Sequence, residues 1–418
     1  MVRSPSARYP SLPARPPPDA ANSSAGIAGP DSILLPCTPL CLMPSSNVSP
    51  DARRLAHRSI LVDGHIDLPD RLHHFDEDPA DATIGGDFDY PRAQQGGLDA
   101  AFMALYLPSA LQTTPGAAPK RADALLDRVQ RMTRMHPDAF SLSVSPTKVR
   151  ELASTDTIAL PVGMENGAGI GNDLDALHHF YDRGVRYITL THDAHNQIGD
   201  SSYGDGDPRW GGLSPFGHDV IDEMNRLGMM IDVSHVTDRT AWDVLDHTAA
   251  PIIASHSGCR HFTPGWERNL SDALIEAIAE TGGIIMITFG SPFLRAPYRE
   301  QDDPIEDAVA SYLDTRGWAD DSKDAVEYEQ KMRRLHPIGT VSGVADHIDH
   351  AVALAGEDHV GLGSDFDGVF ALPKNLQDVS HYPNLIAELL RRDYSEATLR
   401  KILGENLLRV WSDVDAHT

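Results

Sequence analysis

The chain has 418 residues, 41% of them hydrophobic, and 61 Asp and Glu against 35 Lys and Arg give it a formal net charge of −26. This acidity disfavours nucleic acid and anionic membranes as partners, because both carry negative charge. Three cysteines are too few for a disulfide framework. No apolar run reaches the ~18 residues that a transmembrane helix needs.

Residues 1–55 are rich in Pro, Ser and Ala and show no hydrophobic period, so we expect a disordered N-terminal extension. The catalytic domain is then expected at 56–412, a length typical of one α/β barrel with insertions. The apolar run at 33–37 is short and broken by Pro36, which is unlike an export signal, and residues 411–418 carry no hydrophobic anchor. We therefore expect a cytoplasmic protein that needs no membrane, with export as the alternative.

From residue 60 onward, strand-like and helix-like segments alternate, which predicts a parallel sheet covered by helices. Most of the strand candidates are near-continuous apolar runs, as in strands buried on both faces. The eight expected strands are Ile60–Asp67, Ala100–Leu107, Ile158–Glu165, Arg186–His192, Met229–His235, Pro251–His256, Gly283–Phe289 and His359–Asp365. Eight strands joined by helical crossovers predict a (β/α)8 TIM barrel.

Amphipathic patterns between the strands predict the covering helices. They are Arg121–Met135, Leu174–Arg183, Gly217–Leu227, Asp238–His247, Asp272–Glu280, Val341–Ala355 and Leu385–Arg392. Ser271 precedes one helix as an expected N-cap, and Gly228 and Gly356 follow two others as expected C-terminal glycines. Residues 295–335 form a charged insertion after the seventh strand, which we interpret as a helical lid, with a solvated excursion as the alternative.

Six of the eight expected strands end in His, Asp or Glu. The first ends in His65 and Asp67, which are two apart and so share one face of the strand. The other five end in Glu165, His192, His235, His256 and Asp365. In a TIM barrel the carboxyl ends of the strands meet at the catalytic mouth, so we predict that these side chains converge there.

The ligand set points to two metal ions. Its members are His65, Asp67, Glu165, His235 and His256. Five ligands exceed the number that a single zinc ion can bind if it keeps one coordination position open. Glu165 is the candidate bridge, because a carboxylate has two oxygens. Two ions ~3.5–4 Å apart would share a water and lower its pKa toward neutrality. Imidazole and carboxylate ligands suit Zn²⁺ best, with Mn²⁺, Co²⁺ and Fe²⁺ as other occupants, so we expect two Zn²⁺ per subunit.

The remaining polar residues suggest further roles. His192 is either a sixth ligand or a donor to a developing oxyanion. Asp365, beside a bridging hydroxide, could take its proton and pass it to a leaving amine. Arg268 could clamp a substrate carboxylate, and Arg260 competes for that role. Cys259 is interpreted as a buried thiol that does not bind metal.

Seven segments closely resemble the membrane (renal) dipeptidase family of zinc peptidases, and the likeness runs from Leu61 to about Val410. They are Asp63–Asp67, Gly163–Gly167, Tyr187–His192, Ile231–Val236, Ile253–Ser257, Gly363–Val369 and Tyr382–Leu390. The resemblance implies a binuclear zinc TIM barrel that hydrolyses dipeptides. Such enzymes often accept a D-residue at the C-terminal position, and some relatives cleave β-lactam rings.

The resemblance also implies residue roles. It gives His65 and Asp67 to one zinc, His235 and His256 to the second, and makes Glu165 the bridge. It further implies that His192 contacts substrate, that Arg268 binds the substrate carboxylate and that Asp365 is the catalytic acid and base. Mammalian members carry a signal peptide, disulfides and a lipid anchor, none of which is evident here. Membrane attachment is therefore not inferred, and a homodimer is left open.

Three functions compete at this point. The leading one is a binuclear zinc dipeptidase that attacks the peptide bond of dipeptides with a metal-bridging hydroxide. The second is a related metal-dependent amidohydrolase, such as an N-acyl amino-acid deacylase or a β-lactam-cleaving enzyme. The third is a non-catalytic scaffold, which is disfavoured because every ligand position and Asp365 are filled.

Overall fold

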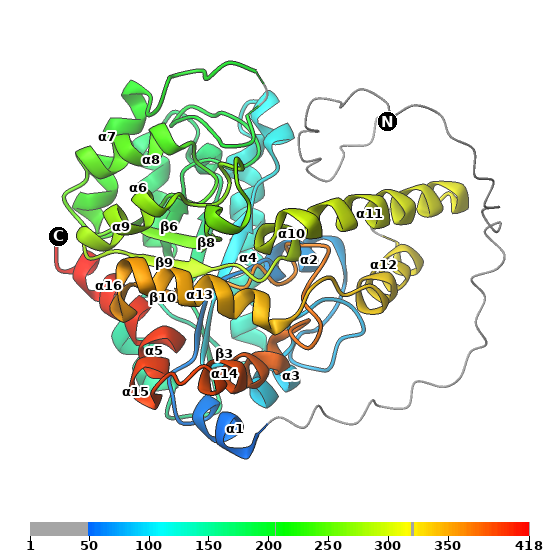
Figure 1. Cartoon of the computed structure of the whole chain (residues 1–418). Helices are drawn as coiled ribbons and strands as arrows, with labels where there is room; N and C mark the ends of the chain where they lie inside the picture. The colour runs from blue at the N-terminus through cyan, green and yellow to red at the C-terminus, as the bar shows by residue number, and fades with distance from the viewer. Residues whose placement is uncertain (1–48, 205, 319–321, 418) are drawn as a thin grey trace, which may run out of the picture.

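The computed structural model describes residues 49–204, 206–318 and 322–417 (Figure 1). Residues 1–48, most of the expected N-terminal extension, lie outside this range. The expected boundary at residue 55 falls within helix α1 (Pro50–Ala56), whose Ala52 and Leu55 are buried. Helix α1 packs against α14 (Tyr382–Arg391), so the folded domain begins a few residues before the expected boundary.

The strands form one parallel sheet that curls into a TIM-barrel-like fold. Its eight barrel strands, in spatial order, are β1 (Val62–Ile66), β2 (Ala100–Tyr106), β5 (Val162–Glu165), β6 (Val185–Thr189), β7 (Met230–Asp232), β8 (Ile253–Ser257), β9 (Ile284–Ile287) and β10 (Val360–Leu362). Ile66 bridges Phe366, just beyond β10, and Asp365 N donates to His65 O at 3.1 Å. These contacts bring the first strand beside the end of the last. Seven of the eight expected strands are confirmed as single strands, several of them shorter than expected, such as β7 and β10.

The sheet has one feature that the sequence pattern did not predict. The expected strand Ile158–Glu165 is divided at Pro161 into β4 (Ile158–Leu160) and β5. Proline has no N–H to donate, so a break in the ladder falls there. β4 pairs with β2 and with an additional short strand, β3 (Phe140–Leu142), which extends the sheet beyond the barrel.

Helices connect the strands, and most of them cover the outside of the barrel (Figure 1). In addition to α1 and α14 they are α2 (Leu68–His74), α3 (Tyr90–Gly96), α4 (Ala117–Met135), α5 (Pro146–Leu152), α6 (Leu174–Asp182), α7 (Pro215–Leu227), α8 (Asp238–His247), α9 (Asp272–Glu280), α10 (Ser291–Leu294), α11 (Ala296–Arg316), α12 (Lys323–Leu335), α13 (Val341–Ala355), α15 (Glu396–Arg400) and α16 (Asn406–Asp415). Shorter turns are η2 (Ser109–Thr113), η3 (Gly167–Ile170), η4 (Arg260–Phe262), η5 (Glu357–His359), η6 (Val379–His381) and η7 (Lys401–Glu405).

The expected helices are confirmed to within a few residues at each end, and their caps are as expected. Ser271 Oγ accepts a hydrogen bond from Leu274 N at the start of α9. Gly228, with φ of 70°, ends α7, and Gly356, with φ of 84°, ends α13. A positive φ favours glycine, which explains its presence at both positions.

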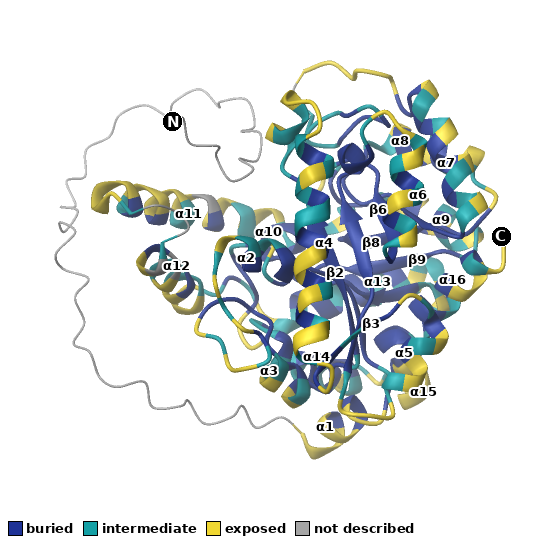
Figure 2. Cartoon of the chain, turned by 180° about the vertical axis from the view of Figure 1, so that it is seen from behind, coloured by how far each residue is buried: buried dark blue, intermediate teal, exposed yellow. Residues whose placement is uncertain are grey.

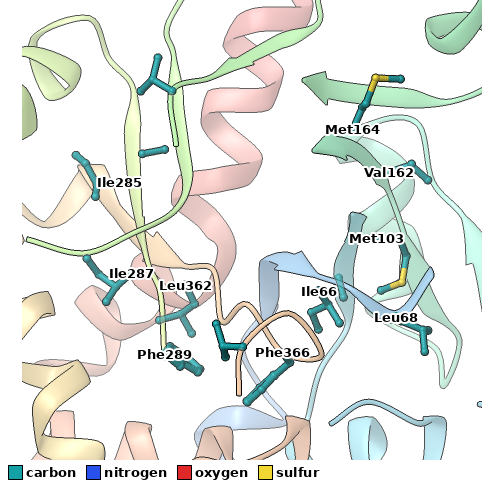
Figure 3. Close-up of a cluster of buried hydrophobic side chains, with 14 of the residues drawn as sticks. Ile66, Leu68, Met103, Val162, Met164, Ile285, Ile287, Phe289, Leu362 and Phe366 are labelled. Carbon is teal, nitrogen blue, oxygen red and sulfur yellow. The ribbon is translucent and has the colours of Figure 1, made fainter. Parts of the chain in front are cut away.

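The buried hydrophobic residues form two main clusters, and Figure 2 shows that burial is concentrated on the strands and on the inner faces of the helices. Outside the strands, a large cluster packs under the helices, and Figure 3 shows Ile66 and Phe366 in the part of it where the barrel closes. Inside, a second cluster includes Val62, Ala100, Ile253 and Ile284 at the amino ends of strands, together with α16. Helix α16 thus fills the amino end of the barrel, and the carboxyl ends are left for polar residues.

The charged insertion is helical. It comprises α11 and α12, which project away from the barrel (Figure 1). Val309 and Leu313 of α11 and Ala325 of α12 form a small hydrophobic core between the two helices. Near the start of α11, the Arg299 guanidinium lies 4.7 Å from the ring centroid of Trp266, in the loop after β8. Within the described residues, no helix combines the length and apolar character that crossing a membrane requires.

Candidate metal centre

Glu165 is the centre of the polar cluster at the carboxyl end of the barrel. Its Oε1 lies 3.2 Å from both His235 Nε2 and His256 Nε2, and its Oε2 lies 3.5 Å from His65 Nε2. Asp67 Oδ2 is 3.5 Å from the same nitrogen of His65. Each carboxylate oxygen of Glu165 therefore faces a different pair of predicted ligands. All five predicted metal ligands come together, and all are buried.

The orientation of His65 is fixed from inside the barrel. Tyr187 on β6 donates its hydroxyl hydrogen to Gly64 O at 3.2 Å, so its oxygen can accept from His65 Nδ1, 2.8 Å away. This directs His65 Nε2 toward Glu165 and Asp67, each 3.5 Å away. The Tyr187 ring needs Gly163 as its neighbour, because a Cβ there would lie 2.0 Å from the ring.

His256 is oriented by a second chain of hydrogen bonds. The Ser255 hydroxyl donates to Asp232 Oδ2 at 2.5 Å, and so its oxygen accepts from His256 Nδ1 at 2.7 Å. Asp232 is buried on β7 and also accepts from Thr189 Oγ1. Partners of this kind select the tautomer and direction of an imidazole that binds a metal. His256 Nε2 consequently faces Glu165.

Burial and charge set the protonation states of the cluster. Burial, followed by the charge of Arg268, lowers the pKa of His235 well below its ordinary value; burial, followed by His65, does the same for His256. Burial opposes the ionisation of Glu165, but His65 and His192 still hold its pKa well below the ordinary range. His235 and His256 are therefore held neutral and Glu165 ionised, the forms in which these groups bind metal, whereas the charges of Tyr187, Glu165 and Asp67 raise the pKa of His65 well above its ordinary value despite burial.

The residues present fit a pair of divalent transition-metal ions. His65 Nε2 and Asp67 Oδ1 are buried without a hydrogen-bond partner, although burying such atoms unpaired is costly. His235 Nε2 and His256 Nε2 are only 2.8 Å apart, and both lie 3.2 Å from Glu165 Oε1, so the two ring nitrogens and this oxygen face a common point. Metal coordination would satisfy all of these atoms. His65, Asp67 and Glu165 could hold one ion, and Glu165, His235 and His256 the other.

The side chains of His192 and Arg268 lie beside this group. His192 Nε2 is 3.5 Å from Glu165 Oε1, and its Nδ1 is 3.3 Å from Asp193 Oδ1. Arg268 is 2% exposed, and its Nη2 lies 3.0 Å from His235 Nε2. The competing Arg260 instead forms an ion pair with Asp238, with Nη1 and Nη2 at 2.7 and 2.5 Å from its two oxygens. Arg268 is thus the arginine that the structure places at the cluster.

Asp365, which follows the last strand, β10, lies at the edge of the cluster. It is 7% exposed, and its carboxylate falls within 4.8 Å of ligand atoms of His65 and His256. Burial, and then the charge of Asp67, raises the pKa of Asp365 well above its ordinary value. Its backbone has a positive φ of 65°, a conformation rarely adopted by residues other than glycine and often found where side chains are aimed at a functional site.

A buried ion pair supports this loop. Arg71, on α2 directly after Asp67, donates from Nη1 to both oxygens of Asp367 at 2.9 and 2.8 Å. Asp367 Oδ1 also accepts from Asp87 N at 2.6 Å. Between the two loops, a Cβ on Gly368 would lie 2.3 Å from Asp67 and 2.4 Å from Asp365. The Arg71–Asp367 ion pair therefore helps to hold the two candidate site residues Asp67 and Asp365 close together.

Sequence reasoning did not identify the supporting groups. Tyr187, Asp232, Ser255 and Arg71 sit in or beside the quoted segments, but their roles depend on contacts across strands. The only signal was their position: Asp232 and Ser255 precede His235 and His256 on the same strands or strand ends. Cys259, as interpreted, is a buried free thiol, and it joins none of the potential ligand clusters formed by the described residues.

A parallel barrel with buried imidazoles and carboxylates at the carboxyl ends of its strands is characteristic of metal-dependent hydrolases. Residues 50–418 match the family model described as membrane dipeptidase (peptidase family M19). The chain belongs to this family, and it is a metallo-dipeptidase.

Solved structures agree with this assignment. A probable dipeptidase, PvdM, from Pseudomonas aeruginosa is 28% identical, with a TM-score of 0.74 over 88% of this chain and 98% of its own. A metallo peptidase from Rhodobacter sphaeroides, liganded with a phosphinate mimic of the dipeptide L-Ala-D-Ala, is 27% identical. Its TM-score is 0.68 over 85% of this chain and 99% of its own. Dipeptidase AC of family M19 is 28% identical, with a TM-score of 0.68 over 85% and 98% of the two chains.

Proposed function

We propose that this metallo-dipeptidase uses two Zn²⁺ ions bridged by Glu165 to hydrolyse dipeptides that have a free C-terminal carboxylate. The observation that carries the proposal is the position of Glu165. One of its oxygens faces His235 and His256, and the other faces His65, at 3.2 to 3.5 Å. Asp67, whose Oδ2 lies 3.5 Å from His65 Nε2, would complete the ligand set of the ion beside His65.

Two Zn²⁺ ions held by these residues would lower the pKa of a water between them toward neutrality and so would supply the nucleophile. The chain's own residues bind and orient the substrate and move its protons. His192 is placed to donate a hydrogen bond to the scissile carbonyl oxygen as negative charge develops on it. The charge of Glu165, followed by the contact with Asp193, raises the pKa of His192 despite burial, which favours this donor form.

Asp365 is assigned the proton transfer. Its raised pKa suits a carboxyl group that must take a proton and then give it to the departing amine near neutral pH. The loop that carries it is held by the Arg71–Asp367 pair, so its oxygens stay close to Asp67.

Arg268 is assigned the recognition of the substrate carboxylate. A guanidinium can hold a carboxylate through two parallel hydrogen bonds, and Arg268 is buried beside the cluster with its Nε unpartnered. Binding the terminal carboxylate near the ions would limit substrates to short peptides. The Rhodobacter sphaeroides neighbour, with its dipeptide mimic, supports this choice of substrate class.

A substrate panel tests the proposal. The purified protein, supplied with Zn²⁺, is assayed with L-Ala-D-Ala and other dipeptides, with the same dipeptides amidated at the C-terminus, and with N-acyl amino acids. We expect free dipeptides to be hydrolysed with the highest kcat/KM. If N-acyl amino acids are cleaved and no dipeptide is turned over with either Zn²⁺ or Co²⁺, the deacylase is the better assignment.

A further inference from the structure

A second group of potential metal ligands lies on the outside of the barrel, away from Glu165. It contains His261 of η4, Asp272 at the first position of α9 and His350 of α13. One ligand atom from each residue falls within 4.8 Å of the other two. We propose that these three residues form a separate binding site for a divalent transition-metal ion such as Zn²⁺.

The geometry of the three side chains fits one ion. His350 Nε2 is already 2.8 Å from Asp272 Oδ1, and the rings of His261 and His350 stack with centroids 4.4 Å apart and planes at 26°. Two imidazoles and one carboxylate form a donor set that borderline ions prefer. The side chains of His261 and Asp272 are exposed and can rotate toward the half-buried His350, and zinc would hold the three atoms at ~2.0–2.2 Å.

The backbone around the site is already in place. Cys259 N donates to His347 Nδ1 at 2.9 Å, which ties the segment before η4 to α13 one turn from His350. The Phe262 ring packs against His347 and His350, with centroids 4.5 and 5.7 Å away. Binding would therefore order side chains and require little movement of the backbone, which lowers its entropic cost.

Exposure and charge also favour a cation. His261 and Asp272 are exposed, so water can complete a four-coordinate shell. Two cationic side chains nearby are neutralised by partners: Arg260 pairs with Asp238, and Arg295 pairs with Asp346. The net charge of −26 further favours binding of a divalent ion over its repulsion.

An ion at this site would cross-link the loop between β8 and α9 to α13. That loop runs from a candidate metal ligand, His256, through η4 to the candidate substrate-binding residue, Arg268. Helix α13 leads into β10 and so toward Asp365. The expected consequence is higher thermal stability of the metal-bound protein, because the ion binds only the folded arrangement of three separate segments.

The chain provides a matched control on the neighbouring helices α7 and α8. His247 of α8 lies 2.9 Å from Asp222 of α7, and the His218 ring is 4.6 Å from the His247 ring. Among the described residues, however, these three do not bring one ligand atom each within 4.8 Å of one another. His247→Gln therefore removes a surface histidine of the same kind from a place where no ion is expected.

Equilibrium dialysis of the full-length, tag-free protein against micromolar Zn²⁺ tests the proposal. We expect wild type and His247→Gln to bind the same number of ions, and His261→Asn and Asp272→Asn to bind one fewer. Zn²⁺ should also raise the Tm of wild type more than that of His261→Asn.

Equal zinc content in wild type and both site variants would overturn the proposal, as would an equal loss in His247→Gln. The readout does not depend on dipeptidase activity, which His261→Asn should retain. A negative result in this zinc-binding experiment can therefore be distinguished from a failure of the proposed metal centre around Glu165.

Discussion

Replacing Asp365 by Asn removes the proposed proton carrier and preserves the shape of the side chain. The backbone contacts of this residue are unaffected, since Asp365 N donates to His65 O and Gly368 N donates to Asp365 O. The Arg71–Asp367 pair also remains, so the loop should keep its position. The variant therefore isolates the loss of a titratable group beside the cluster.

The size of the effect follows from the role. General acid–base catalysis contributes about 10²- to 10⁴-fold, or about 3 to 5 kcal/mol of transition-state stabilisation. We expect kcat for L-Ala-D-Ala to fall by at least about 10²-fold, with bound zinc unchanged, because none of the five proposed ligands is altered. The assay pairs steady-state kinetics with metal analysis of the same samples. Asp99→Asn is the control and should keep full turnover, because Asp99 is a half-buried carboxylate that accepts from Leu61 N near the amino end of the barrel.

Two results would refute this reasoning. If Asp365→Asn loses zinc in proportion to activity, Asp365 is a metal ligand and its assignment as proton carrier is wrong. If kcat falls less than about tenfold with zinc retained, another group moves the proton.

Three further predictions concern binding, the supporting ion pair and pH. Arg268→Ala should raise KM for free dipeptides much more than for dipeptides amidated at the C-terminus. An equal rise of KM for both would contradict the assignment of Arg268 to carboxylate recognition. Arg71→Ala should lower the free energy of unfolding in urea by about 3 to 5 kcal/mol, because Asp367 is left charged and buried. Arg226→Ala, which removes an arginine whose side chain is 59% exposed, should lower the free energy of unfolding by less than about 1 kcal/mol. Equal losses in the two variants would contradict a stabilising role of the buried Arg71–Asp367 pair. Burial raises the pKa of Asp99 to about 7. The unfolded chain therefore ionises first, and this group costs stability increasingly as pH rises from about 4 to about 7. Asp99→Asn should then gain Tm over wild type at about pH 8 but not at about pH 4, and a constant difference would be inconsistent with this pKa.

Much of the fold follows from local pattern. The run Ile284–Ile287 is apolar throughout because both faces of a barrel strand are buried. The helix Asp272–Glu280 follows Ser271, a residue type that favours the N-cap position. The break at Pro161 and the short strand β3 were missed. A three-residue strand at the edge of a sheet has little periodicity to detect.

The candidate site was predictable only in part, for a related reason. Parallel strands bring their carboxyl ends to one mouth, so the convergence of His65, Glu165 and His256 follows once the barrel is assumed. Supporting contacts such as Arg71 with Asp367 join residues 296 positions apart. They depend on register and side-chain direction, which one sequence does not encode locally. The exterior group around His350 was missed for the same reason, because its members share no motif.

The most direct test of the central claim is a crystal structure of the zinc-loaded protein with anomalous scattering recorded at the zinc edge. We expect two peaks at the mouth of the barrel, ~3.5–4 Å apart, one near each carboxylate oxygen of Glu165. One peak should also lie near His65 and Asp67, and the other near His235 and His256. A single peak at this mouth, or a pair that Glu165 does not bridge, would contradict the proposed mechanism.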